Sequence, residues 1–259
     1  KALFDENPMM MTEERHEVSQ VVATASRYQG LKFFGVVSEW DKDTTKQFAA
    51  ITVEVEPSVR LVIFRGTDDT LIGWKEDFHM TYMDHVPAQK RAASYLQNVM
   101  KEFPKGRFMV AGHSKGGNLA TYACTYLPDP LFERVDAIYS YDAPGLNKAI
   151  IETEGYQRTS PNIRRFVPQG SIVGMMLEVP EPTTIVKSRA FGGFAQHDAF
   201  TWEIKDYSFV TVSETSPDSQ QTDLTLKQWV RETSAEERKK FFDTFFGIFL
   251  DAGITSIND

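Results

Sequence analysis

The chain has 259 residues, of which 41% are hydrophobic, and its formal net charge of −8 gives a sequence pI near 5.2. A chain of this length and composition can bury a sizeable core, so we expect one domain over residues 1–259. The acidic balance argues against a protein that binds nucleic acid phosphates, because nothing supplies a basic face. No apolar run is long enough to span a bilayer, so we expect no stable membrane insertion.

The single cysteine, Cys124, leaves no possibility of an intramolecular disulfide. The lack of a disulfide fits a reducing compartment, so we expect a cytoplasmic protein. We also expect no metal ion and no cofactor. Cys124 lies in a helix-like segment, where a buried structural thiol is expected rather than a reactive one. The chain begins with Lys1 rather than methionine, which leaves open a missing N-terminal portion.

The first part of the chain predicts one helix and then a hairpin. Residues 12–28 carry apolar side chains at helical spacing, with Thr12 near the expected start. Three strand candidates rich in Val, Ile and Phe follow at residues 31–40, 47–56 and 59–66. They predict a β-hairpin that enters a sheet.

Helical patterns and short apolar strands alternate from residue 87 onward. Helices are predicted over 87–103 and 117–127, and strands over 106–112, 135–142 and 163–167. This alternation is typical of a parallel sheet with helices on both faces. The predicted fold class is therefore α/β, with a mostly parallel, twisted sheet.

The last part of the chain predicts two more strands and a helical end. The strand candidates cover residues 183–191 and 202–212, and a polar linker is expected over 213–223. Ser234 and Glu237 have the spacing of a capping box at the start of a helix with a broad phenylalanine stripe. We expect residues 222–259 to form a helical segment packed on the domain.

A Gly-x-Ser-x-Gly pattern, formed by Gly112, Ser114 and Gly116, lies between a predicted strand and a predicted helix. A serine nucleophile at such a turn is strained, and small neighbours let the strand and the helix approach each other closely. The alternative is an ordinary Gly/Ser-rich loop. The context of strand, turn and helix favours Ser114 as a nucleophile.

A serine nucleophile needs a base and a group that orients the base. Among the five histidines, His197 falls in a late loop, where the order nucleophile, acid, histidine places the base. Asp142 ends a strand at the same sheet edge as Ser114 and is the favoured acid. Asp198 is a poor alternative because side chains of neighbouring residues diverge in an extended loop. His113 is expected to point inward and pack.

The oxyanion of a tetrahedral intermediate needs hydrogen-bond donors. The amide of Lys115, directly after the nucleophile, is one, and Thr67 offers an amide and a hydroxyl. The Lys115 side chain is expected to make a surface contact. The following segment could cover an apolar site with Trp74, Phe78 and Met80. Further residues could line an acyl pocket, namely Phe191, Phe194, Met175, Met176 and Leu177.

Two stretches, "IFRGTDDTLIGWKEDF" and "VAGHSKGGNLA", resemble the class 3 lipase-like branch of the α/β-hydrolases, most closely a bacterial group in it. The resemblance covers roughly Gln47 to Trp202. It implies a lipase-like fold with Ser114 as nucleophile, His197 as base, the oxyanion hole at Thr67 and the Lys115 amide, and a lid after Thr67. Two departures stand out: Ser171 occupies the usual place of the triad aspartate, and Lys115 replaces a usual leucine.

The sequence therefore predicts a serine hydrolase that cleaves carboxylic esters through an acyl-enzyme on Ser114. The expected substrate is a small-molecule or lipid ester. The same residues could serve a thioesterase or an acyltransferase, because fold and triad do not choose the acyl donor. The competing class is a non-catalytic binding protein that retains the fold.

Overall fold

An eight-stranded sheet forms the centre of the computed structural model, which describes residues 13–67 and 71–254. Strands β3 to β7 are parallel neighbours, whereas β1, β2 and β10 pair antiparallel. In sheet order, the strands are β1 (Lys32–Asp41), β2 (Lys46–Glu56), β3 (Val59–Phe64), β4 (Arg107–His113), β5 (Val135–Tyr141), β6 (Ile163–Pro168), β7 (Thr183–Val186) and β10 (Thr211–Val212). A small separate pair consists of β8 (Ile204–Lys205) and β9 (Ser208–Phe209).

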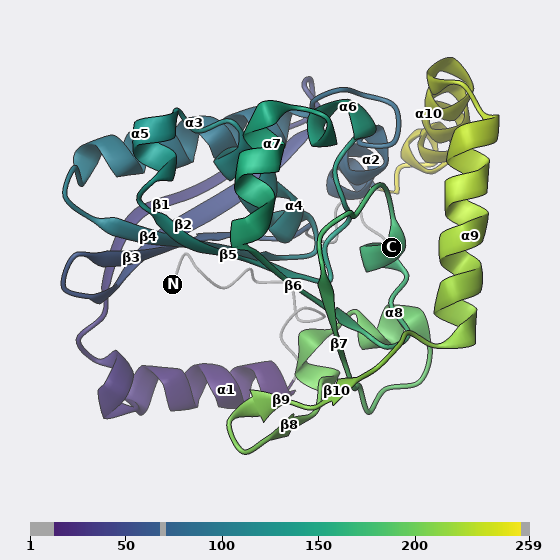
Figure 1. Ribbon diagram of the computed structural model, residues 1–259. Coiled ribbons are helices and arrows are strands. Elements are labelled where there is room, and N and C mark those ends of the chain that lie inside the picture. The colour runs from purple at the N-terminus through teal and green to yellow at the C-terminus, as the bar shows by residue number, and fades with distance from the viewer. Residues whose placement is uncertain (1–12, 68–70, 255–259) are drawn as a thin grey trace.

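Helices lie on both sides of the sheet, and two more stand at one end of it (Figure 1). One face of the sheet carries α3, α4, α5 and α7, and α1 lies on the opposite side. At one end of the sheet, α9 and α10 stand beside α2. The helices are α1 (Glu13–Thr24), α2 (Leu71–His79), α3 (Pro87–Glu102), α4 (Lys115–Thr125), α5 (Asp129–Phe132), α6 (Lys148–Ile151), α7 (Glu154–Thr159), α8 (Gly193–Gln196), α9 (Pro217–Glu232) and α10 (Ala235–Asp251). No helix in these described ranges is long and apolar enough to cross a membrane.

The main core lies between the sheet and the helices α3 and α4. On β4, Phe108 and Val110 alternate with more exposed residues and are completely buried. On α3, Ala92 and Leu96 lie one turn apart on the buried face. Every residue of α4 is buried, which is expected for the helix that follows a central strand.

A second, smaller core joins α2 to the C-terminal helices. Leu71 of α2 packs with Phe242 and Phe246 of α10, and all three are nearly inaccessible to solvent. The predicted capping box is confirmed, since Ser234 and Glu237 exchange hydrogen bonds at the start of α10. Part of the phenylalanine stripe thus packs inward, whereas Phe241 and Phe245 stay exposed.

The predicted α/β class is confirmed, but several local expectations are wrong. The strand expected over 183–191 ends at Val186. The strand expected over 202–212 is divided by a turn at Asp206 and Tyr207, so that β8 and β9 form a separate pair and only β10 joins the main sheet.

The expected polar linker 213–223 is wrong from Pro217 onward, because Ser216 caps α9 there and accepts a hydrogen bond from the Ser219 amide. The helix expected over 12–28 ends at Thr24 and is followed by a 3₁₀ turn, while Thr12 lies outside the described residues. Serine and aspartate are as common at helix N-termini as in loops, so the polar composition of residues 213–223 did not reveal that α9 begins at Pro217.

The parallel register aligns the carboxyl ends of the central strands. Phe64 pairs with Gly112, and His113 pairs with Tyr141. The residues directly after β3, β4 and β5 therefore meet at one sheet edge, where open α/β sheets bind their ligands. This arrangement, with a helix directly after β4, is that of the α/β-hydrolase fold.

Candidate active site

Ser114 occupies the sharp turn between β4 and α4. Its φ of 58° and ψ of −134° lie in a region that costs a non-glycine residue conformational energy. The turn is also crowded: a Cβ placed on Gly112 would lie 2.1 Å from the Gly116 carbonyl carbon, and one on Gly116 would lie 2.1 Å from the Phe64 oxygen. Glycine is therefore required on both sides of Ser114.

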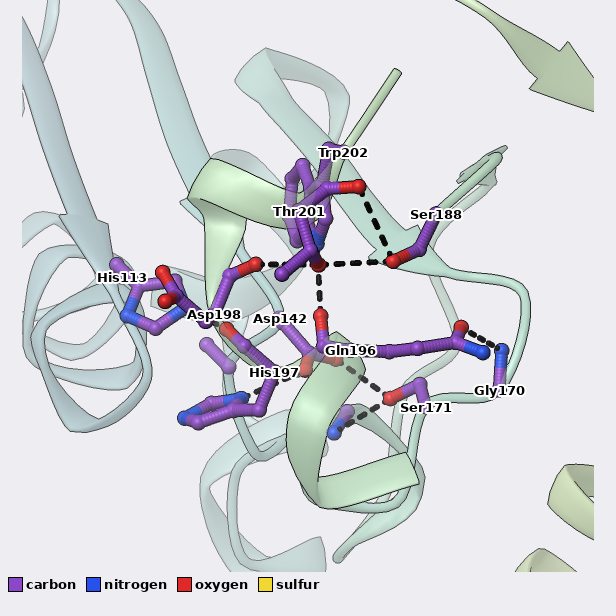
Figure 2. Close-up of polar contacts among 12 residues, drawn as sticks. His113, Asp142, Gly170, Ser171, Ser188, Gln196, His197, Asp198, Thr201 and Trp202 are labelled. Atoms are coloured by element: carbon purple, nitrogen blue, oxygen red, sulfur yellow. Dashed lines mark hydrogen bonds and ion pairs between the residues drawn. The ribbon is translucent and has the colours of Figure 1, made fainter. Parts of the chain in front are cut away.

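His197 and Asp142 form a close pair at the same sheet edge (Figure 2). Asp142 follows β5 directly and is completely buried, and its Oδ2 lies 2.7 Å from His197 Nδ1. A proton on Nδ1 that is donated to this carboxylate leaves Nε2 as the hydrogen-bond acceptor of the ring. The pair expected from the sequence is thus brought together.

Ser114 and His197 line one cavity of about 550 Å³. Among the described residues, no hydrogen bond joins the Ser114 hydroxyl to the imidazole. In active sites without substrate, such hydrogen bonds are often long or poorly aligned and tighten only when the substrate binds.

Ser171 contacts the other oxygen of Asp142. Its hydroxyl donates a hydrogen bond of 2.5 Å to Asp142 Oδ1 and accepts one of 2.9 Å from the Gly174 amide. The buried Arg165 guanidinium donates to the Ala143 and Gly174 carbonyls, so it ties together the loops that carry Asp142 and Ser171. Ser171 therefore orients the Asp142 carboxylate from the position that the family resemblance gave as the usual place of the triad aspartate.

The loop that carries His197 is fixed by hydrogen bonds of the preceding residue, Gln196. The Gln196 side chain accepts from the Gly170 amide and donates to the Ala190 carbonyl, at 2.8 Å and 3.1 Å. The Trp202 indole N–H donates to the Gln196 carbonyl at 2.8 Å. Figure 2 shows Gln196 reaching across to Gly170. These contacts preorganise His197 next to Asp142.

His113 also contacts the His197 loop, a role that the sequence did not indicate. Its Nε2–H donates to the His197 carbonyl oxygen at 2.7 Å, and the two rings lie 4.5 Å apart. Burial lowers the pKa of His113 to about 4, with a smaller effect of the neighbouring His197. His113 is thus uncharged near neutral pH, and it does not repel a positive charge that forms on His197.

The loop after β3 lies against the nucleophile turn. A Cβ placed on Gly66 would lie 3.2 Å from the Ser114 Cβ. The neighbouring Thr67 donates its hydroxyl to Asp77 Oδ2 of α2, so this hydroxyl is already engaged. The Lys115 amide belongs to the first turn of α4, where backbone N–H groups lack helical partners. The amides of Thr67 and Lys115 are therefore the candidate oxyanion donors.

The surface contact expected for the Lys115 side chain is wrong, because this side chain is completely buried. Its ammonium donates to the carbonyl and side-chain oxygens of Gln47, at 2.9 Å and 2.6 Å, and to Glu76 Oε2 at 3.1 Å. Glu76 of α2 is equally buried and also accepts from the amides of Gln47 and Ala88. Because α2 folds back over the nucleophile turn, it covers a lysine that would otherwise reach solvent.

Aromatic and aliphatic side chains form much of the cavity wall. They include Trp74, Phe78, Val173, Met176, Phe194 and Phe200. The expected acyl-pocket residue Phe191 is instead fully exposed, and Met80 is buried away from the cavity lining that the structure describes. Part of the segment expected to act as a lid, residues 68–70, lies outside the described residues.

The rim of the cavity carries an ion pair that includes the first helix. Arg15 of α1 lies 3.1 Å from Asp198 and over the Phe200 ring. Asp198 thus points toward Arg15, in agreement with its expected unsuitability as the partner of His197. Within the described parts of the chain, no group of three or more His, Cys, Asp or Glu side chains could hold a metal ion.

Comparisons with solved structures find lipases with low sequence identity. The M37 lipase is 15% identical with a TM-score of 0.44, and the match covers 62% of this chain and 60% of that lipase. A lipase from Rhizopus microsporus var. chinensis is 15% identical with a TM-score of 0.47, with 85% and 79% coverage. The Rhizomucor miehei lipase propeptide complex is 16% identical with a TM-score of 0.45, with 88% and 80% coverage. The bacterial subgroup expected from the sequence stays a prediction.

The sequence was also compared with curated proteins and with family models. No curated protein matches the chain. A family model described as Mbeg1-like matches residues 22–247, a span that includes every candidate site residue. Because this match extends over most of the chain, the protein belongs to the Mbeg1-like family.

Proposed function

We propose that this chain is a serine hydrolase that cleaves carboxylic esters through an acyl-enzyme on Ser114. The pairing of the buried Asp142 with His197, beside a cavity that Ser114 also lines, is the observation that carries the proposal. A carboxylate in this place holds the imidazole in the tautomer whose Nε2 can accept a proton. A serine nucleophile requires a base of this kind.

The proposed reaction begins when Ser114 Oγ attacks the ester carbonyl carbon and its proton passes to His197 Nε2. The amides of Thr67 and Lys115 stabilise the oxyanion of the tetrahedral intermediate. The carbon–oxygen bond to the alcohol then breaks, and the imidazolium protonates the leaving alkoxide. Water attacks the acyl-enzyme by the same route, which releases the acid and regenerates the Ser114 hydroxyl.

The lining of the cavity supports an ester with an apolar acyl group. Trp74, Phe78 and Phe194 line the same cavity as Ser114 and offer apolar contact area there. Apolar contacts made by the acyl group hold the carbonyl near Ser114, and this positioning lowers the entropic cost of the attack.

A fluorophosphonate probe tests the proposal, because it modifies serine nucleophiles that a base activates. We expect the wild-type protein to be labelled and the Ser114→Ala variant to remain unlabelled. Ser208→Ala, at an exposed serine on β9, is the matched control and should be labelled like the wild type. A folded wild-type protein that takes up no label would contradict the proposal and would favour a binding protein without catalytic activity.

A further inference from the structure

A second cavity, of about 250 Å³, lies between α2, the start of α6 and the C-terminal helices α9 and α10. Its apolar lining includes Leu146, Leu177, Leu226, Trp229, Val230 and Phe242. Residues of α9 and α10 thus form a large part of the wall of this cavity, in addition to their packing on α2. Neither the fold nor the reaction at Ser114 accounts for this space.

The two cavities share two lining residues, Phe78 and Met176. The Phe78 ring stacks on Phe242 of α10 at 4.6 Å between ring centres, which holds this side of the boundary in place. Met176 lines the other side with a flexible, unbranched side chain. The second cavity therefore begins where the cavity around Ser114 ends.

The backbone around Met176 is firmly held, so its side chain is the movable part of the boundary. The Met176 carbonyl accepts from the Gly145 amide at 2.8 Å, and the next residues pair through Leu146 and Glu178. A Cβ on Gly145 would lie 2.0 Å from the Glu178 oxygen, which shows how closely the two segments approach. The Met176 side chain can thus change its conformation at this boundary without a shift of the backbone.

Charged residues at the second cavity already have partners or face solvent. Lys227 pairs with Asp223 at 2.8 Å, and Arg238 donates to the carbonyls of Thr81 and Val230. Lys148 is largely exposed, with 76% of its side-chain surface accessible. The buried part of the cavity therefore offers apolar contact rather than a charge for a ligand.

We propose that this second cavity binds the distal part of a long, unbranched acyl chain whose ester carbonyl lies at Ser114. The proposal rests on the ester hydrolysis proposed above. The chain passes between Phe78 and Met176 and ends among apolar side chains of α9 and α10, including Leu226 and Val230. The C-terminal helices thereby select esters of longer acyl chains over acetate esters, because each buried methylene adds favourable transfer free energy.

Filling the second cavity at a distance from Ser114 tests this inference. Leu226→Trp adds bulk to the lining, and Leu224→Trp is the matched control on the same helix, at a residue that is 60% exposed. We expect kcat/KM of Leu226→Trp for p-nitrophenyl dodecanoate to fall about tenfold or more, with little change for the acetate ester. Leu224→Trp should behave as the wild type with both substrates.

The outcomes separate this inference from the proposed function. A wild-type protein that hydrolyses none of these esters contradicts the proposed function. A wild-type protein that hydrolyses them, together with an unchanged chain-length profile in a folded Leu226→Trp variant, overturns the second cavity as the acyl site.

A binding measurement tests the same site without catalysis. Dodecanoate should bind to Ser114→Ala in calorimetry and bind at least about tenfold more weakly when Val230→Phe is added. Equal affinity of the two proteins contradicts the inference, even if Leu226→Trp does not fold.

Discussion

Two hydrogen bonds from opposite sides fix the Asp142 carboxylate, and each oxygen has its own partner. Oδ2 faces His197, and Oδ1 accepts from Ser171. The two partners restrict the carboxylate to one orientation, so the imidazole is held by geometry as well as by charge. The carboxylate follows β5 here, and the loop after β6 supplies the hydroxyl that orients it.

Replacing Asp142 tests the importance of the tautomer. In Asp142→Asn the shape is kept, but an amide that donates to Nδ1 favours the tautomer with its proton on Nε2. We expect kcat for an activated ester to fall about ten-thousandfold, as for the same change in a well-studied serine protease triad. Unchanged circular dichroism would show that the fold persists, and a loss below about tenfold would refute the assignment.

Ser171 offers a sharper test at the same carboxylate. Ser171→Asp places a second carboxylate against Asp142 Oδ1, and two adjacent carboxylates resist ionising together. We expect the acidic limb of the kcat/KM profile to move to higher pH. Ser171→Ala removes one hydrogen bond without adding charge and should leave that limb near its wild-type position. The same limb in both variants would argue against this contact in solution.

At the scale of elements, α2 is tied to the nucleophile turn through a buried ion pair. The Lys115 ammonium and the Glu76 carboxylate are both completely inaccessible to solvent. Glu76 also accepts from the amides of Gln47 on β2 and Ala88 on α3, so one side chain joins α2 to α4, β2 and α3. The segment that resembles a lid is thus anchored through its middle, and an opening of α2 would leave buried charges unpaired.

Breaking this pair should destabilise the whole chain. Lys115→Met leaves the Glu76 carboxylate buried without its cation, and we expect the free energy of unfolding to fall by about 3–5 kcal/mol. Adding Glu76→Gln removes the uncompensated charge and should restore part of the loss. Urea denaturation of the wild type, both single variants and the double variant gives the coupling. A Lys115→Met variant within about 0.5 kcal/mol of the wild type would contradict the anchoring role.

At the scale of the whole molecule, two buried histidines make stability depend on pH. Burial lowers the pKa of both His79 and His113 from 6.5 to about 4. Between these values the unfolded chain binds protons that the folded chain does not, so stability falls as the pH decreases from 6.5 toward 4.

Variants can isolate this contribution. His79→Gln should flatten the dependence of the urea midpoint on pH within this window. His16→Gln, at an exposed histidine on α1, is the control and should leave the dependence unchanged. Equal slopes in the wild type and His79→Gln would show that His79 does not titrate as its burial implies.

The sequence predicted what local patterns encode, and it missed the contacts that depend on tertiary placement. The turn at Ser114 follows from five consecutive residues, and the central strands and the helices α3 and α4 follow from periodicity. Glu76, by contrast, lies 39 residues from Lys115, in the charged segment that was expected to cover an apolar site. His113 and the carbonyl that it contacts are 84 residues apart. No local signal distinguishes these polar groups from solvated ones.

The ion pair of Lys115 and Glu76 also bears on how this chain can vary among its relatives. A single replacement at either position leaves a lone charge in a dry environment, whereas a joint replacement by two apolar residues leaves none. Selection therefore removes sequences with a single replacement at one of these positions more often than sequences in which both residues are replaced. Positions 76 and 115 should therefore change together across the Mbeg1-like family. Such covariation would reflect the direct contact between these two side chains.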